Sequence, residues 1–191
     1  LNKFKEIEAH LSRNSRTVYV ELDGDDVKGD GSINKPFATT ARALLEMAGT
    51  TRRLIISLGV GDHECSKPTL QYGQFEFVGA GRLMLDAGGA AQMVVLEGAD
   101  MALYVDVVDV STIGFGAAFY LAHGSNLILG KGVNIALSKA AFLVRNERGQ
   151  NAYSSHTSVI TSTTAIPKVQ ETINSEPLSL YEWSTTYTNI T

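Results

Sequence analysis

Four acidic residues lie in two closely spaced pairs that could supply the two carboxyl groups of a glycosidase. Glu97 and Asp100 flank a Gly-Ala dipeptide, and Asp106 and Asp109 stand at the two ends of one apolar run. Cleavage of a glycosidic bond needs carboxyl groups about 5 Å apart for retention, or about 6.5–9.5 Å apart for inversion. Adjacent strands lie about 4.8 Å apart and alternate residues of a strand about 7 Å apart, so a sheet can present such pairs. Charged residues are ordinary at turns and strand ends, so a non-catalytic role is favoured for all four.

Two further groups of side chains could take part in acid–base chemistry or bind a metal ion. The tripeptide Asp62-His63-Glu64 follows a strand at a glycine turn, and His123 lies in a similar turn. We interpret both as solvated loops, although the tripeptide holds a possible acid–base set. No metal-ligand spacing, nucleotide-binding loop or nucleophile motif stands out, and no cofactor is expected.

The segment 23–31 is rich in oxygen ligands, with four carboxylates and three glycines among its residues. Calcium sites are built from such loops, which makes Asp23, Asp25 and Asp30 candidate ligands. The helix–loop–helix calcium pattern requires Glu at its twelfth position, where this chain has Asn34. An exposed Gly/Asp turn is therefore the favoured interpretation.

Aromatic residues suggest where a carbohydrate could bind. Tyr72, Tyr104 and Tyr120 are candidates, although tyrosines in strands more often belong to a core or an interface. Three more aromatics, at positions 181, 183 and 187, lie two to four residues apart in a Thr-rich stretch. We expect these to form an edge strand or a contact between subunits.

The elements that must position these residues are short strands. Between positions 53 and 164, apolar runs alternate with glycine-bearing turns, and Val94, Phe119 and Phe142 head similar stretches 25 and 23 residues apart. A period in the twenties is typical of a solenoid. Leucine-rich repeats share that period, but their leucine and asparagine signature is missing. A β-sandwich is the rival, and it is disfavoured because two-residue hairpin signals are not evident.

Two helices are expected before the strands. Over 37–48, Phe37, Ala41, Leu44, Leu45 and Ala48 fall on one face, with Thr39 or Thr40 as the N-cap and Gly49 as the stop. This helix should close the open end of the solenoid. The sequence thus predicts an all-β fold, a short right-handed parallel β-helix of about five or six coils with an N-terminal capping helix.

The flanking segments are expected to be arms of the central 17–164 domain. Residues 1–16 predict a short helix whose apolar face carries Leu1, Phe4, Ile7 and Leu11. That face packs either on its own domain or in a threefold bundle with two sister chains. Residues 165–191 lose the apolar pattern, contain two prolines and are rich in Ser and Thr, which predicts an extended C-terminal arm or linker.

Composition excludes several classes of function. The chain has 191 residues, of which 44% are hydrophobic and 19% charged, as in an ordered protein. Its net charge is -4, and no Lys/Arg cluster alternates with aromatics, so no nucleic acid partner is expected. No apolar run approaches the roughly 20 residues needed to span a bilayer. The single cysteine, Cys65, allows no internal disulfide.

The order of motifs resembles the N-terminal part of pectate-lyase-like β-helix proteins, and is most similar to bacteriophage tail fibres and tailspikes. Val18-Tyr19-Val20 is followed by a Gly/Asp loop ending at Gly29-Asp30-Gly31. Pro36-Phe37-Ala38-Thr39, an Ala/Leu helix and Leu54-Ile55-Ile56-Ser57-Leu58 come next. The similarity covers about 60 residues and indicates an architecture, because the same arrangement serves lyases, hydrolases and non-catalytic fibres.

The resemblance implies a homotrimer in a virion, made in the host cytoplasm and assembled with other phage tail or baseplate proteins. It also implies contact with bacterial surface polysaccharide. We therefore expect a structural, receptor-contacting segment of a tail fibre or tailspike. A polysaccharide-degrading tailspike, acting as a lyase or glycosidase, is one alternative, although enzymes of the family usually have a longer β-helix. A bacterial surface or secreted β-helix adhesin is the other.

Overall fold

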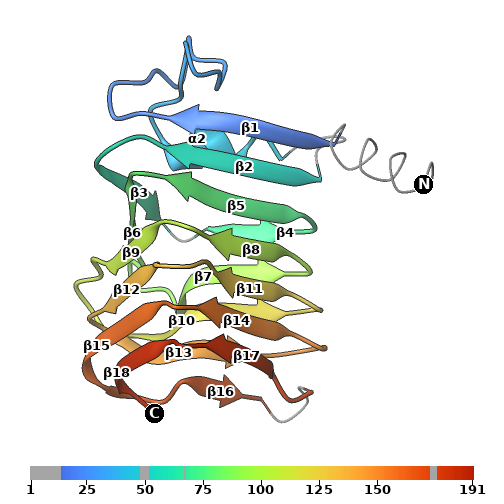
Figure 1. Ribbon diagram of the computed structural model, residues 1–191, viewed down its shortest axis with the longest axis vertical. Coiled ribbons are helices and arrows are strands. Elements are labelled where there is room, and N and C mark those ends of the chain that lie inside the picture. The colour runs from blue at the N-terminus through green and yellow to red at the C-terminus, as the bar shows by residue number, and fades with distance from the viewer. Residues whose placement is uncertain (1–13, 48–51, 67, 173–175) are drawn as a thin grey trace.

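Three parallel β-sheets wrap one apolar core in the computed structural model, which describes residues 14–47, 52–66, 68–172 and 176–191. From β2 onward the chain visits a seven-stranded, a six-stranded and a five-stranded sheet in turn, and then repeats the circuit. The coils stack along one axis (Figure 1). This arrangement is a parallel β-helix, as the sequence predicts.

Each sheet takes one strand from each successive coil. The seven-stranded sheet contains β1 (Ser15–Val20), β2 (Arg53–Leu58), β5 (Gln74–Gly79), β8 (Asp100–Leu103), β11 (Asn126–Leu129), β14 (Ala152–His156) and β17 (Ser179–Trp183). The six-stranded sheet contains β3 (Asp62–Ser66), β6 (Arg82–Asp86), β9 (Asp106–Asp109), β12 (Asn134–Leu137), β15 (Val159–Ile166) and β18 (Thr186–Ile190). The five-stranded sheet contains β4 (Thr69–Gln71), β7 (Gln92–Glu97), β10 (Phe115–Ala122), β13 (Ala140–Asn146) and β16 (Val169–Glu171).

Strand pairing excludes the β-sandwich. Every pair of named strands in the described residues is parallel, whereas a sandwich of hairpins requires antiparallel neighbours.

The number of residues per coil is more regular in the five-stranded sheet than the expected spacings of 25 and 23. Val94 pairs with Phe119 and Phe119 with Val144, so this sheet advances 25 residues at each of these two steps. Phe142, the expected third member of the series, pairs instead with Ala117.

The core is a continuous column of inward-facing side chains. In the seven-stranded sheet one such row consists of Leu54, Phe75, Met101, Leu127 and Tyr153, which pair in register and are each at most 3% exposed. Alternate residues of a strand point to opposite faces, so the neighbouring rows point to solvent. Residues on the outer rows are therefore free to differ in polarity without disturbing the core.

The capping helix is present but shorter than predicted. Helix α2 spans Thr40–Leu44, and Thr39 is its N-cap. Phe37 lies before the helix, in a bridge with Val20, so the expected stripe that starts at Phe37 is out of phase with α2. Ala48 and the expected stop Gly49 lie outside the described residues. The helix buries Thr40 and Ala43, while Leu45 is 69% exposed.

The two flanking segments differ from expectation where the structure describes them. β1 begins at Ser15, inside the predicted 1–16 helix, and pairs along its whole length with β2. The proposed trimer contacts Leu1, Phe4, Ile7 and Leu11 lie outside the described residues.

The predicted C-terminal arm does not separate from the β-helix at position 165. β16, β17 and β18 continue the three sheets and pair in parallel with the preceding coil. The Ser- and Thr-rich sequence is tolerated because many of its side chains are exposed and those facing the core include polar pairs, such as the hydroxyls of Ser155 and Thr185 at 2.6 Å.

Candidate functional site

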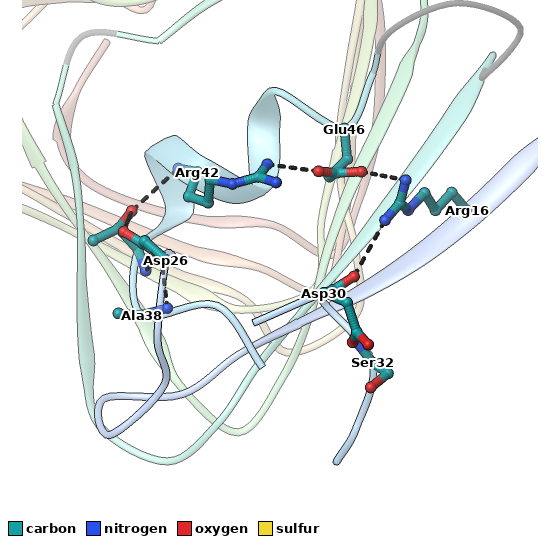
Figure 2. Close-up of polar contacts among 8 residues, drawn as sticks. Arg16, Asp26, Asp30, Ser32, Ala38, Arg42 and Glu46 are labelled. Atoms are coloured by element: carbon teal, nitrogen blue, oxygen red, sulfur yellow. Dashed lines mark hydrogen bonds and ion pairs between the residues drawn. The ribbon is translucent and has the colours of Figure 1, made fainter. Parts of the chain in front are cut away.

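The Gly/Asp loop 23–31 is held in place by Asp26, which is not among the three candidate calcium ligands. Asp26 Oδ1 accepts hydrogen bonds from the backbone N–H of Ala38 (2.8 Å) and Thr39 (3.0 Å), and its Oδ2 accepts one from the Thr39 hydroxyl (2.7 Å) (Figure 2). Thr39 in turn accepts a hydrogen bond from the N–H of Arg42 as the N-cap of α2. The loop and the Pro-Phe-Ala-Thr motif therefore form one structural unit.

An ion-pair chain ties the same unit to β1. Glu46 lies between Arg42, at 2.5 Å, and Arg16, whose guanidinium also donates to the carbonyl of Asp30 (Figure 2). Arg42 also lies over the Phe37 ring, 4.3 Å from its centroid. These contacts connect the strand, the loop and the helix that close this end of the core.

Two of the three calcium candidates, Asp25 and Asp30, serve the turn itself. Asp25 accepts backbone hydrogen bonds from Val27 and Lys28, and Asp30 accepts one from Ser32. No three His, Cys, Asp or Glu side chains within the described ranges are grouped to hold a metal ion. A cleft of about 430 Å³ lies beside the loop, where Lys28 and Lys35 join Asp23 and Asp25 in its lining. The lysines make it a poor cation site.

Replacing Asp26 by alanine should loosen this cap. The substitution removes the acceptor for two backbone N–H groups and one hydroxyl at a half-buried position, which we expect to cost about 1–2 kcal/mol of unfolding free energy. Urea unfolding of the Asp26→Ala protein would measure the loss. Asp23→Ala, in the same loop at an exposed position, is the matched control and should leave the unfolding midpoint unchanged. Equal effects of the two substitutions would contradict the assigned role of Asp26.

The first pair of candidate catalytic carboxylates is divided between two sheets. Glu97 ends β7 and accepts a hydrogen bond from the Gln71 amide at 2.7 Å. Asp100 begins β8, beyond the corner, and accepts hydrogen bonds from Asn126 (2.5 Å) and Gln74 (3.4 Å). Each carboxylate stabilises pairing with an adjacent coil.

The second pair is divided between the two faces of β9. Asp106 is partly exposed and accepts hydrogen bonds from the backbone and side-chain nitrogens of Asn134. Asp109 is buried, and it accepts hydrogen bonds from the backbone N–H of Ser111 (2.8 Å), Ser138 (3.0 Å) and Lys139 (2.9 Å). Burial alone would raise the pKa of Asp109, but these bonds outweigh it and hold the pKa below the ordinary value. Asp109 is thus an ionised acceptor at a coil corner.

Stability should fall in acid because of such carboxylates. The pKa of Asp109 and that of Asp26 are both lowered on folding, against the effect of burial, by hydrogen bonds to the charged form. A lowered folded-state pKa stabilises the protein above the ordinary value of 3.8, and this stability is lost as the pH falls through the folded values. The urea concentration at the unfolding midpoint should therefore be constant near neutral pH. It should decrease once the pH falls below the ordinary aspartate pKa. A midpoint that rises in acid would contradict this assignment.

The histidine-containing tripeptide is not assembled as an acid–base set. His63 points inward from β3, is 3% exposed and lies with Nε2 2.9 Å from the Gly59 carbonyl oxygen. Asp62 points outward and pairs with Arg82 at 2.8 Å. His123 occupies a corner with φ 58, and its N–H donates to the Arg148 carbonyl.

The three candidate tyrosines lie on separate surfaces. Tyr72 occupies an exposed corner after β4, and Tyr120 points outward from the five-stranded sheet beneath Arg145. Tyr104 follows β8 on the seven-stranded sheet and is 50% exposed. Tyr104 differs from the other two in lying on the seven-stranded sheet, beside the outward-facing rows described next.

Three outward-facing rows of the seven-stranded sheet form the strongest candidate site, which we call the outer face. The polar row is Arg53, Gln74, Asp100 and Asn126. The central row is Ile55, Glu76, Ala102, Ile128, Ser154 and Tyr181. The aromatic row is Tyr104, Gly130, His156 and Trp183. Parallel in-register pairing aligns the polar and central rows across the coils, and in the aromatic row it joins His156 to Trp183, so most of the face is an ordered array.

A small hollow lies in the outer face. Its volume is about 120 Å³, and Gln74, Glu76, Asp100, Ala102 and Ile128 contribute to its lining together with two further residues. Ala102 leaves this space because its methyl group lies between two longer side chains of the central row. Arg53 borders the hollow and forms a two-bond ion pair with Glu76, at 2.8 and 3.0 Å.

The aromatic row includes a glycine that makes room for a ring. A Cβ at Gly130 would collide with the Tyr104 ring, so that ring lies over the glycine. One coil further, His156 stacks on Trp183 with ring centroids 4.3 Å apart and planes 8° apart. Tyr181 lies beside Trp183, at 6.4 Å and 15°.

Sequence reasoning named Asp100 and Tyr104 as candidate site residues, expected Tyr181 and Trp183 in an edge strand or a subunit contact, and missed the other members of this face. The missing signal was the spacing of polar residues. Gln74, Asp100 and Asn126 stand 26 residues apart and begin successive strands of one sheet. The apolar period of the core revealed the coils, but the polar period on the outside revealed the face.

Comparisons of the chain with family models, with curated proteins and with solved structures found no match. Among the described residues, no helix is long and apolar enough to cross a membrane.

Proposed function

We propose that this chain is a structural, host-attachment segment of a trimeric bacteriophage tail fibre or tailspike, and that it contacts bacterial surface polysaccharide through the outer face. The observation that carries the proposal is the in-register array of polar, small and aromatic side chains along one side of a stiff β-helix. Aromatic and amide groups that are fixed on a rigid scaffold lose little conformational entropy when they bind a flexible polysaccharide chain.

The resemblance of the N-terminal motifs supports the fibre assignment. Their contacts explain why such motifs recur independently of activity. Asp26, Thr39 and the helix they hold close the first coil, which is a requirement of the fold rather than of a reaction. A segment of a virion fibre would use this closed, rigid rod as a spacer and as a contact surface.

A non-catalytic role fits the hydrogen bonds made by the four candidate catalytic carboxylates. Glu97, Asp100, Asp106 and Asp109 each accept hydrogen bonds from a neighbouring coil. A general acid needs a raised pKa, whereas the pKa of Asp109 is lowered. These four residues therefore serve the β-helix.

Two measurements test the proposed function. Molar mass at several concentrations should give a stable trimer, and a stable monomer would overturn the fibre assignment. Labelled protein should bind intact bacteria of some strains of a panel and lose that binding after their capsule or lipopolysaccharide is stripped. New reducing ends or unsaturated uronates in the supernatant would instead indicate a polysaccharide-degrading enzyme. A signal sequence upstream in the parent gene would favour the bacterial adhesin.

A further inference from the structure

We propose that the outer face binds a chain of uncharged or amino-substituted pyranoses, with Tyr181 and Trp183 stacking on sugar rings and the hollow at Ala102 receiving a ring substituent. This inference rests on the proposed function and adds to it the position of the ligand and the chemical class of its sugars.

The stacking platform is flat and open. Tyr181 and Trp183 are two residues apart on β17, and their centroid separation of 6.4 Å is close to the rise of two strand residues. Their rings therefore lie side by side, and both are about half exposed, at 52% and 51%. His156 covers one face of Trp183 and fixes the orientation of the indole. A preordered pair of this kind offers its π-faces to the polarised C–H groups of a sugar ring.

The hollow offers hydrogen bonds rather than apolar contact. Around the Ala102 floor the Gln74 amide donates to Asp100, and both Glu76 oxygens accept from Arg53. A carboxylate has about four lone-pair sites, so Asp100 and Glu76 can accept further hydrogen bonds. A volume of about 120 Å³ suits one substituent, such as a hydroxymethyl or amino group, and not a whole sugar. Hydroxyl and amino groups can donate to these acceptors, as an apolar group cannot.

The two subsites lie on one line. Ala102 and Tyr181 belong to the same row and are separated by three strand-to-strand steps, through Ile128 and Ser154. This corresponds to roughly 14 Å along the coil axis. A short oligosaccharide running across the strands would therefore meet both subsites, passing over Ile128 and Ser154 between them.

Charge decides which sugars are accepted. Around the hollow, the carboxylates of Glu76 and Asp100 face a single cation, Arg53, which is already paired with Glu76. A uronate or a nucleic acid phosphate brought to this surface would be repelled, and neutral or cationic sugars would not.

The test uses tryptophan fluorescence, because Trp183 is the only tryptophan of the chain. The probes are oligosaccharides of N-acetylglucosamine, of glucosamine and of galacturonate, together with oligothymidylate. We expect a saturable change in emission with the first two probes, and at least roughly tenfold weaker binding of the galacturonate oligomer, a difference of about 1.4 kcal/mol. Absence of a saturable change with the first two probes up to their solubility limit overturns the inference. Equal or stronger binding of galacturonate or oligothymidylate overturns it as well.

Variants locate the ligand. Trp183→Ala should weaken calorimetric binding of the favoured oligosaccharide roughly tenfold, whereas Trp183→Phe keeps a ring and should lose less. Ala102→Leu should fill the hollow and weaken binding while Trp183 emission still responds. Tyr72→Ala, which removes an exposed tyrosine elsewhere, is the matched control and should have no effect. Unchanged affinity in both Trp183→Phe and Ala102→Leu would overturn the inference, even if Trp183→Ala failed to fold.

The bacterial binding assay separates this inference from the proposed function. Wild-type protein that fails to bind any strain counts against attachment itself. Wild-type protein that binds bacteria, together with Trp183→Phe and Ala102→Leu variants that bind them equally well, leaves attachment standing and removes the outer face as its site. A change in molar mass caused by Trp183→Ala would show that the platform is a contact between copies of the chain.

Discussion

Replacing Asp109 by alanine is expected to lower the unfolding free energy by about 3–5 kcal/mol. The carboxylate is buried and accepts three backbone N–H groups, from Ser111, Ser138 and Lys139. Two of these donors belong to the following coil, so the substitution leaves unpaired N–H groups at a corner shared by two coils. Urea unfolding followed by circular dichroism would measure the change.

Two variants make the Asp109 experiment decisive. Asp109→Asn keeps one acceptor oxygen and should lose about half as much stability. Asp106→Ala alters a partly exposed carboxylate on the same strand, and it should cost roughly 1 kcal/mol or less. If Asp109→Ala left stability unchanged but abolished cleavage of a polysaccharide, the catalytic interpretation of Asp109 would be restored.

The β-helix could be predicted because its core repeats. Every coil must place apolar side chains on the same inward rows, so runs such as 54–58 and 93–96 recur with glycine turns between them. Gly79 and Gly98 have φ of 114° and 61°, values that side chains disfavour, and therefore both corners are marked in the sequence.

The ends of the β-helix were harder to predict because one side of an end coil has no neighbouring coil. The strand β17 faces the core with Leu180, which is 46% exposed, and with Glu182, which pairs with Lys168 at 3.0 Å. Such a coil lacks the continuous apolar signal of the middle of the protein. At the other end, Phe37 pairs with Val20 before α2 begins, a tertiary contact that shifts the helical stripe.

The candidate site was the least predictable part, because it is assembled across coils. Arg53 meets Glu76, and Asn126 meets Asp100, from positions more than twenty residues apart. Local reasoning paired carboxylates that are neighbours in sequence, such as Asp106 and Asp109. Alternation along a strand sends these two to opposite faces, so close spacing was a misleading guide.

A buried polar ladder should be the second most sensitive feature of the fold. Asn151 Oδ1 accepts a hydrogen bond from the Ser125 N–H (2.8 Å), and its Nδ2 donates to Asn146 Oδ1 (2.6 Å) and to the Leu121 carbonyl (3.2 Å). Ser125 Oγ lies 3.2 Å from the Ala99 nitrogen, which extends the ladder by one coil. The ladder satisfies polar groups at the corner between the five-stranded and the seven-stranded sheet, where the backbone turns out of both.

Asn151→Ala is therefore expected to cost about 2–4 kcal/mol of unfolding free energy, because the Ser125 N–H and the Asn146 Oδ1 lose a buried hydrogen-bond partner. Asn134→Ala, at the exposed start of β12, is the matched control and should cost roughly 1 kcal/mol or less. A double-mutant cycle with Asn146→Ala tests the ladder directly, because Asn146 Oδ1 accepts a hydrogen bond from Asn151 Nδ2 and contacting side chains should show a coupling energy of about 0.5–3 kcal/mol. Strictly additive effects would mean that the corner is stabilised by apolar packing alone, and that the hydrogen bonds between coils are replaced by water when one member is removed.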